Sequence, residues 1–106
     1  MDREELEHSF CWKISSELKL FKYRTLQKEK EEIYGLAYRI DCLINIYEIL
    51  VEQCKKMSIQ ELEVCMSTPE LLIHLYWQWL KIPDAQNKEL EEVIRAAIQE
   101  KKGEAA

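Results

Sequence analysis

Residues 71–80 read Leu-Leu-Ile-His-Leu-Tyr-Trp-Gln-Trp-Leu, and this stretch decides the fold class. It follows the pair Thr68-Pro69, in which threonine suits the N-cap of a helix and proline suits the first helical position. Because Pro83 stops the segment, the sequence predicts a helix over 69–81. That helix is apolar on most of its circumference, so it must be either the central helix of the domain or part of an oligomer interface.

Similar helical periodicity runs through the rest of the chain. The 106 residues suffice for one domain, and only two glycines and two prolines are present, which is too few for sheets and long loops. We therefore expect an all-α single domain of four to five helices, packed as an irregular helical bundle. The expected helices span 3–25, 28–54, 58–66, 69–81 and 85–102, followed by a frayed tail at 103–106.

Local signals place several of these boundaries. Ser58 followed by Glu61 is a capping box, Asp84 is a plausible N-cap for the last helix, and Gly103 is expected to end it. No strong helix breaker separates the first two helices, so one continuous bent helix is an alternative there.

The apolar spacing also predicts which helix faces are buried. On the first helix the expected stripe is Leu6, Phe10, Ile14, Leu18 and Phe21. On the short third helix, Ile59, Leu62 and Met66 are expected to face inward. The second helix has a wide apolar face made of Ile33, Leu36, Ala37, Ile40, Leu43, Ile44, Tyr47, Leu50, Val51 and Cys54.

Charge and cysteine usage set the cellular context that we expect. The net charge is −5, the first residues are acidic without an apolar leader, and no apolar run approaches the roughly 20 residues of a membrane span. The four cysteines, Cys11, Cys42, Cys54 and Cys65, form no Cys-x-x-Cys pair. We expect a cytoplasmic protein that does not bind membranes, with reduced and buried thiols.

The sequence offers little catalytic or metal-binding chemistry. His8 and Cys11 are three residues apart, but together with Cys54, Cys65 or His74 they do not match the spacing of a zinc module. His74 follows Glu70 by four residues, which predicts a solvated ion pair. Without a glycine-rich phosphate loop or a nucleophile with its base, we expect no enzyme, no cofactor, no metal and no small-molecule substrate.

Nucleic-acid binding is one alternative function. Six basic residues against two acidic ones lie in the segment 13–30, and aromatic side chains are interleaved with them. Such a segment can meet a phosphate backbone while an aromatic ring stacks on a base, although cations near a helix end also complement the helix dipole. The candidate contacts of a nucleic-acid accessory protein are Lys19, Lys22, Tyr23, Arg24, Lys28 and Lys30.

Protein–protein binding is the main expectation, because the helix over 69–81 has more apolar surface than one small core can cover. Beside its core face, Ile73, Trp77 and Leu80 form a second apolar line, although Trp77 can also pack beneath the first helix. Surface indoles are typical interface anchors. The partner is another protein or a second copy of the chain. The candidate contacts are Ile73, Trp77 and Trp12, with the acidic strip Asp41, Glu48 and Glu52.

The chain contains the short motifs Glu31-Glu32-Ile33, Ala37-Tyr38, Thr68-Pro69, Leu75-Tyr76, Trp79-Leu80-Lys81 and Asp84. These motifs resemble those of a family of small helical proteins, without an assigned activity, from clostridial gut bacteria and their conjugative and other mobile elements. The chain departs from the pattern in its cysteine-rich second helix and its basic first connection. The resemblance carries no catalytic residues. It implies the cytoplasm of a Gram-positive anaerobe and a role in DNA transfer or in blunting host defence. One such role is an anti-CRISPR-like inhibitor that binds a host nucleic-acid enzyme.

Overall fold

The structure is a computed structural model that describes residues 2–82 and 89–105, and every regular element in these residues is a helix. The all-α fold class is therefore confirmed, with six α-helices in the described residues instead of four or five. The elements are α1 (Arg3–Leu26), α2 (Lys30–Gly35), α3 (Ala37–Gln53), the 3-10 turn η1 (Cys54–Lys56), α4 (Ile59–Ser67), α5 (Leu71–Leu80) and α6 (Leu90–Ala105).

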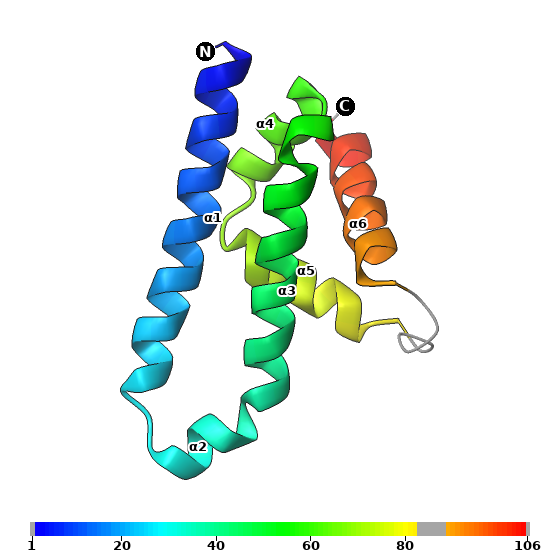
Figure 1. Ribbon diagram of the computed structural model, residues 1–106. Helices are drawn as coiled ribbons and strands as arrows, with labels where there is room; N and C mark the ends of the chain where they lie inside the picture. Colours follow the sequence, from blue (N-terminus) through cyan, green and yellow to red (C-terminus); the bar gives the residue numbers. More distant parts are fainter. Residues whose placement is uncertain (1, 83–88, 106) are drawn as a thin grey trace.

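The helices form two layers (Figure 1). α1 and α3 lie side by side and antiparallel, and α2 joins their ends at the base of the molecule. The helices α4, α5 and α6 lie behind this pair, with α5 crossing behind α3. α5 contacts α1, α3 and α6, so it is central to the fold as predicted. None of the helices in the described residues has the length and hydropathy that crossing a membrane requires.

The core lies between the two layers. The stripe predicted on α1 is confirmed, because Leu6, Phe10 and Ile14 are buried while Leu18 and Phe21 pack against the core as partly buried side chains. The second layer closes the core mainly with Leu62, Cys65, Leu71, Leu72, Leu75, Tyr76, Ile94, Ala97 and Ile98.

The predicted second helix over 28–54 is wrong in its continuity. The chain turns at Gln27–Glu29, so the single bent helix is also wrong. α2 then ends at Gly35, and Leu36 leaves the helical conformation with φ −97° and ψ 6° before α3 begins. Glycine weakens a helix by about 1 kcal/mol relative to alanine, and α2 contributes no buried side chain whose packing would offset that cost.

The wide apolar face predicted for this segment is only partly buried. α3 buries Cys42, Leu43, Ile46 and Leu50, whereas Ile44 and Val51 are exposed. Tyr47 and Ile40 are partly buried. One core contacts only one side of a helix, so the remaining apolar side chains of α3 lie on its outer side.

The predicted N-cap of α5 is also wrong. The hydroxyl of Thr68 instead donates to the carbonyl oxygen of Val64 at 2.8 Å, which closes α4. α5 begins two residues later, after Glu70 in the left-handed conformation with φ 48°. The carboxylate of Glu17, on α1, takes over the capping role and accepts from the backbone N–H of Leu72 at 2.9 Å.

Other local predictions have mixed outcomes. The capping box of Ser58 and Glu61 is confirmed. Ile59 does not face inward, since 48% of it is exposed at the first turn of α4, before the helix reaches the core. Gly103 does not end the last helix, which runs on to Ala105, because no glycine here adopts the positive φ of a helix stop. Pro83, the predicted N-cap Asp84 and the predicted helix start at 85 lie outside the described residues.

Candidate functional site

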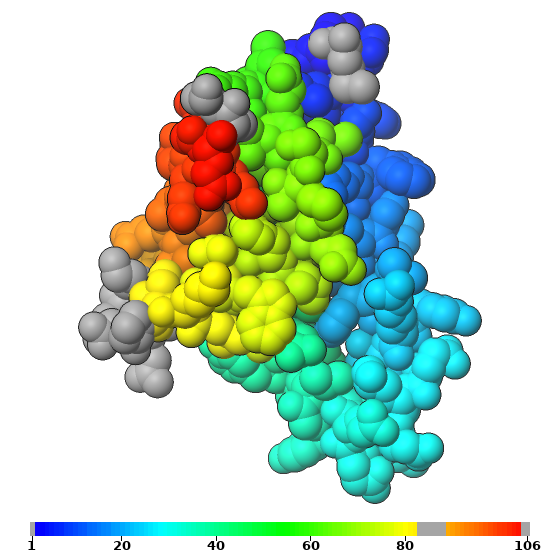
Figure 2. Space-filling model, turned by 180° about the vertical axis from the view of Figure 1, so that it is seen from behind, coloured from blue at the N-terminus to red at the C-terminus, as the bar shows by residue number. Residues whose placement is uncertain are grey.

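The first candidate surface lies on the outer side of α5 and consists of Ile73, Trp77 and Leu80; we call it the Trp77 surface. Trp77 is 48% exposed, so the indole does not pack beneath α1, while Ile73 is half-buried. The view from behind shows that α5, drawn in yellow, forms part of the molecular surface (Figure 2). The sequence therefore located an apolar line that the fold leaves accessible to solvent.

The indole of Trp77 is held by neighbouring side chains. The guanidinium carbon of Arg39, on α3, lies 5.6 Å from the centroid of the Trp77 ring and 5.5 Å from that of Tyr76. The two rings are themselves 5.6 Å apart and tilted by 58°. These cation–π and ring–ring contacts fix the orientation of Trp77 before any partner arrives. Sequence periodicity did not identify Arg39, because its partners lie on another helix.

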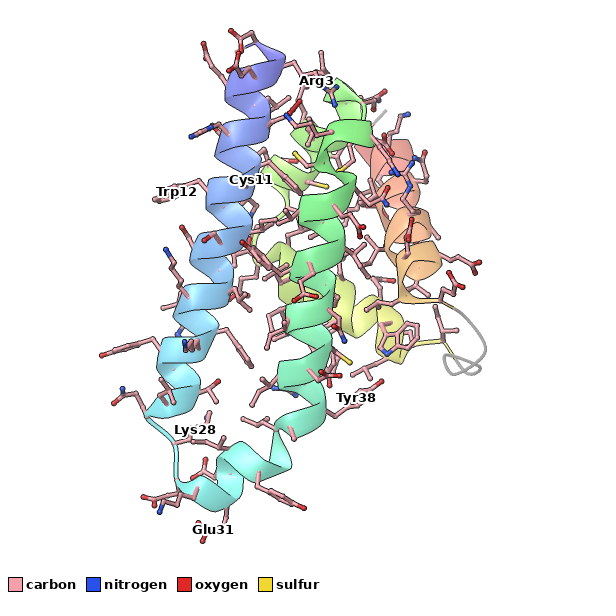
Figure 3. All side chains as sticks on the ribbon, viewed as in Figure 1. Arg3, Cys11, Trp12, Lys28, Glu31 and Tyr38 are labelled. Atoms are coloured by element: carbon pink, nitrogen blue, oxygen red, sulfur yellow. The ribbon has the colours of Figure 1, made fainter. Side chains whose placement is uncertain are left out.

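A polar contact joins the end of α5 to the start of α3. The indole N–H of Trp79 donates to the hydroxyl oxygen of Tyr38 at 2.8 Å. Tyr38 projects from the first turn of α3 and is exposed (Figure 3). The bond therefore ties the far end of α5 to the start of α3.

A second candidate surface follows the seam between α1 and α3 on the face opposite α4, α5 and α6. One hollow is lined by Cys11, Trp12, Tyr47 and Val51, and a second, of about 450 Å³, by Leu18, Phe21, Ile40, Ile44 and Tyr47, among others. Tyr47 lines both hollows, so the two meet at this side chain, and we call them together the α1–α3 groove. The sequence indicated this groove through the wide apolar face of the second predicted helix. Periodicity did not show which residues of that face would be buried in the core and which would stay exposed.

The other predicted contacts lie near the α1–α3 groove. Trp12 is 73% exposed and projects from α1 away from α3 (Figure 3). The acidic strip is exposed along α3 as expected, and Glu48 lines the groove. Ile73 instead lines a different hollow, between the end of α1 and α5. The structure thus divides the predicted contact residues between two surfaces.

The basic residues do not gather on one face. All six candidate nucleic-acid contacts are exposed. Arg24 and Lys28 line the hollow that also contains Ile73 and Glu70, whereas Lys22 lines the α1–α3 groove. The end of α1 therefore presents positive charge in several directions.

The thiols and histidines do not assemble a metal site among the described residues, where no three potential ligands lie close enough to share an ion. All four cysteines are free; three are buried and Cys11 is half-buried. Burial, followed by the neighbouring Cys11, raises the pKa of Cys54 to about 11. Cys11 points from α1 toward α3 (Figure 3). Cys11 and Cys54 are therefore neighbours at one end of the groove.

The predicted ion pair between Glu70 and His74 is wrong, because none of the ion pairs in the described part of the chain joins them. Glu70 lies before the first turn of α5 in the left-handed conformation. His74 is half-buried, and its burial, together with the charges of Lys101 and Lys81, lowers its pKa. Burial and these two charges therefore favour the neutral imidazole over the protonated one.

Comparison with known proteins found no match, so the proposed function rests on the geometry of the two surfaces. No family model, no curated protein and no solved structure matches this chain.

Proposed function

We propose that the protein is a non-enzymatic protein–protein interaction module whose contact surface is the Trp77 surface. The observation that carries the proposal is Trp77 itself, a tryptophan left half-exposed on the central helix and held in position by Arg39. Burying such a side chain at the centre of an interface contributes about 2 kcal/mol or more. Because the ring is already oriented, Trp77 would lose little side-chain entropy when a partner binds it.

The net charge of the chain suggests the class of partner, because the acidic strip lies beside the α1–α3 groove and not on the Trp77 surface. Asp41, Glu48 and Glu52 are exposed on α3, and the chain carries a net charge of −5. A partner with a basic surface therefore complements this molecule. A host nucleic-acid enzyme has such a surface, and inhibition of one in the cytoplasm is the form of the function that fits the resemblance to mobile-element proteins. Direct nucleic-acid binding has weaker support, because the basic residues point in several directions on an acidic protein.

The test is affinity capture from the lysate of a natural host with wild-type protein and with Trp77→Ala. We expect wild type to retain a specific protein that Trp77→Ala loses at least tenfold, which corresponds to about 1.4 kcal/mol. Tyr34→Ala is the matched control, since Tyr34 is an exposed aromatic residue on α2. Equal capture by the two variants would contradict the proposal, and circular dichroism confirms that both remain folded.

A further inference from the structure

We propose that a second copy of this chain occupies the α1–α3 groove, so that two molecules stack their α1–α3 layers face to face as a dimer. The proposal goes beyond the function above, because it concerns a different surface and names its occupant. α4, α5 and α6 cover only one side of the α1–α3 layer. The dimer supplies the layer that the other side lacks, and it leaves the Trp77 surface free for another protein.

The apolar seam along α3 has the spacing of a helix that packs against a neighbour. Ile40, Ile44, Tyr47 and Val51 are separated by four, three and four residues, the alternation by which a helix presents one continuous line to a partner helix. Ile44 is 40% exposed and Val51 is 43% exposed, on a helix whose other side is buried in the core. A second copy would remove this apolar seam from water.

Charges along the rims of the groove make the face complementary to itself. In the hollow nearer α2, Lys22 lies on the α1 rim and Glu48, from the second half of α3, on the opposite rim. In the other hollow the signs are reversed, with Glu4 and Glu7 on α1 and Lys55 just after α3, where Lys55 also pairs with Glu7 of the same chain at 3.1 Å. The four corners therefore alternate in sign. When two copies stack with their helices aligned, either possible two-fold axis brings opposite charges together. A partner of uniform charge would meet repulsion at two of the four corners.

The size of the face predicts a dimer that dissociates on dilution. The 17 residues of α3 extend for about 25 Å, and two neighbouring helices are about 20 Å wide. Each copy therefore contributes roughly 500 Å² in projection, and the pair about 1,000 Å². This area lies at the low end for specific interfaces, where association is weak and depends on concentration.

Light scattering coupled to size-exclusion chromatography, from about 5 to about 500 µM protein, tests the proposal. We expect wild type to change from monomer to dimer within this range. Ile44→Asp places a charge in the seam and is expected to weaken dimerisation at least tenfold while circular dichroism and Tm stay close to wild type. Val51→Lys repeats the test at a second exposed seam position.

Two controls make the test specific. Ile59→Asp changes an isoleucine that is 48% exposed on α4, away from the groove, and is expected to dimerise like wild type. Trp77→Ala is expected to do the same, so a lost Trp77 partner and a lost dimer are separate outcomes. A monomer at every concentration overturns the proposal. So does a dimer that survives both seam variants or that Trp77→Ala abolishes.

Discussion

At the scale of the residue, several roles depend on partners far away in the sequence. Glu17 looks like one more charged residue in a basic segment, yet its carboxylate accepts from the N–H of Leu72 at 2.9 Å and from the ammonium of Lys13 at 2.6 Å. Leu72 lies 55 residues further along the chain. Periodicity describes one helix at a time, so it predicted the cap within a segment, at Ser58, and could not predict the cap supplied by another helix.

His74 provides a pH-dependent prediction at the same scale. Burial first, and then Lys101 and Lys81, hold the pKa of His74 below the ordinary histidine value of 6.5, while Glu104 and Glu100 oppose the shift. The unfolded chain therefore binds a proton more readily than the folded protein does. The resulting stability is complete above the unfolded pKa and is lost as pH falls from 6.5 toward the lower folded value. We expect Tm to decrease from about pH 7.5 to about pH 5.5.

The variant His74→Gln checks the assignment by thermal unfolding across that pH range. We expect it to reduce the slope of Tm against pH, because glutamine has no proton to bind. His8→Gln changes an exposed histidine on α1 and is expected to leave the slope as it is in wild type. A slope unchanged in His74→Gln would show that other groups cause the pH dependence.

At the scale of the element, α3 shows what an apolar sequence pattern predicts and what it does not. Its helical character, its end near residue 54 and its acidic strip were predicted from the sequence, whereas its start at Ala37 was not. Which apolar side chains belong to the core was not, because that depends on where α4, α5 and α6 dock. α3 has more apolar side chains than one core can bury. Only the packing of the other helices determines that Ile46 is buried while Ile44 is exposed.

The two isoleucines give a prediction for this helix. Ile46 is fully buried, so Ile46→Ala is expected to lower the free energy of unfolding by about 2–5 kcal/mol through lost burial and a remaining cavity. Ile44→Ala removes the same atoms from an exposed position on the same helix, and is expected to change the free energy of unfolding by less than about 1 kcal/mol. Urea unfolding below the concentration of any dimer measures both. Similar losses would show that both side chains belong to one core.

At the scale of the whole molecule, composition together with the spacing of apolar residues predicted the fold class. The scarcity of glycine and proline and the helical spacing left few alternatives to a helical domain. The packing of two layers, and the groove that this packing leaves open on α1 and α3, depend on long-range docking that no local pattern contains. The same holds for Trp77, whose exposure follows from the way α5 crosses behind α3.

The fold as a whole also determines thiol reactivity. Burial raises the pKa of Cys65 to about 12 and, with the contribution of Cys11, that of Cys54 to about 11; Cys42 is buried as well. Near pH 8 we therefore expect a thiol reagent to modify half-buried Cys11 first and the other three slowly. Mass spectrometry of the labelled peptides measures the order. In denaturant all four should react alike, and Cys11→Ser should lose only the fast phase. Rapid labelling of Cys65 in the folded protein would contradict this.

The side chain of Arg3 connects the first turn of α1 to η1, the short turn that follows α3. Its guanidinium donates to the carbonyl oxygens of Cys54, Lys55 and Met57, and Figure 3 shows it reaching from the first turn of α1 toward η1. Its acceptors lie 51 to 54 residues further along the chain. During translation at about 5–20 residues per second, they are synthesised roughly 3–10 s after Arg3. α1 therefore lacks this anchor until the 54 residues that follow Arg3, up to Met57, have been synthesised.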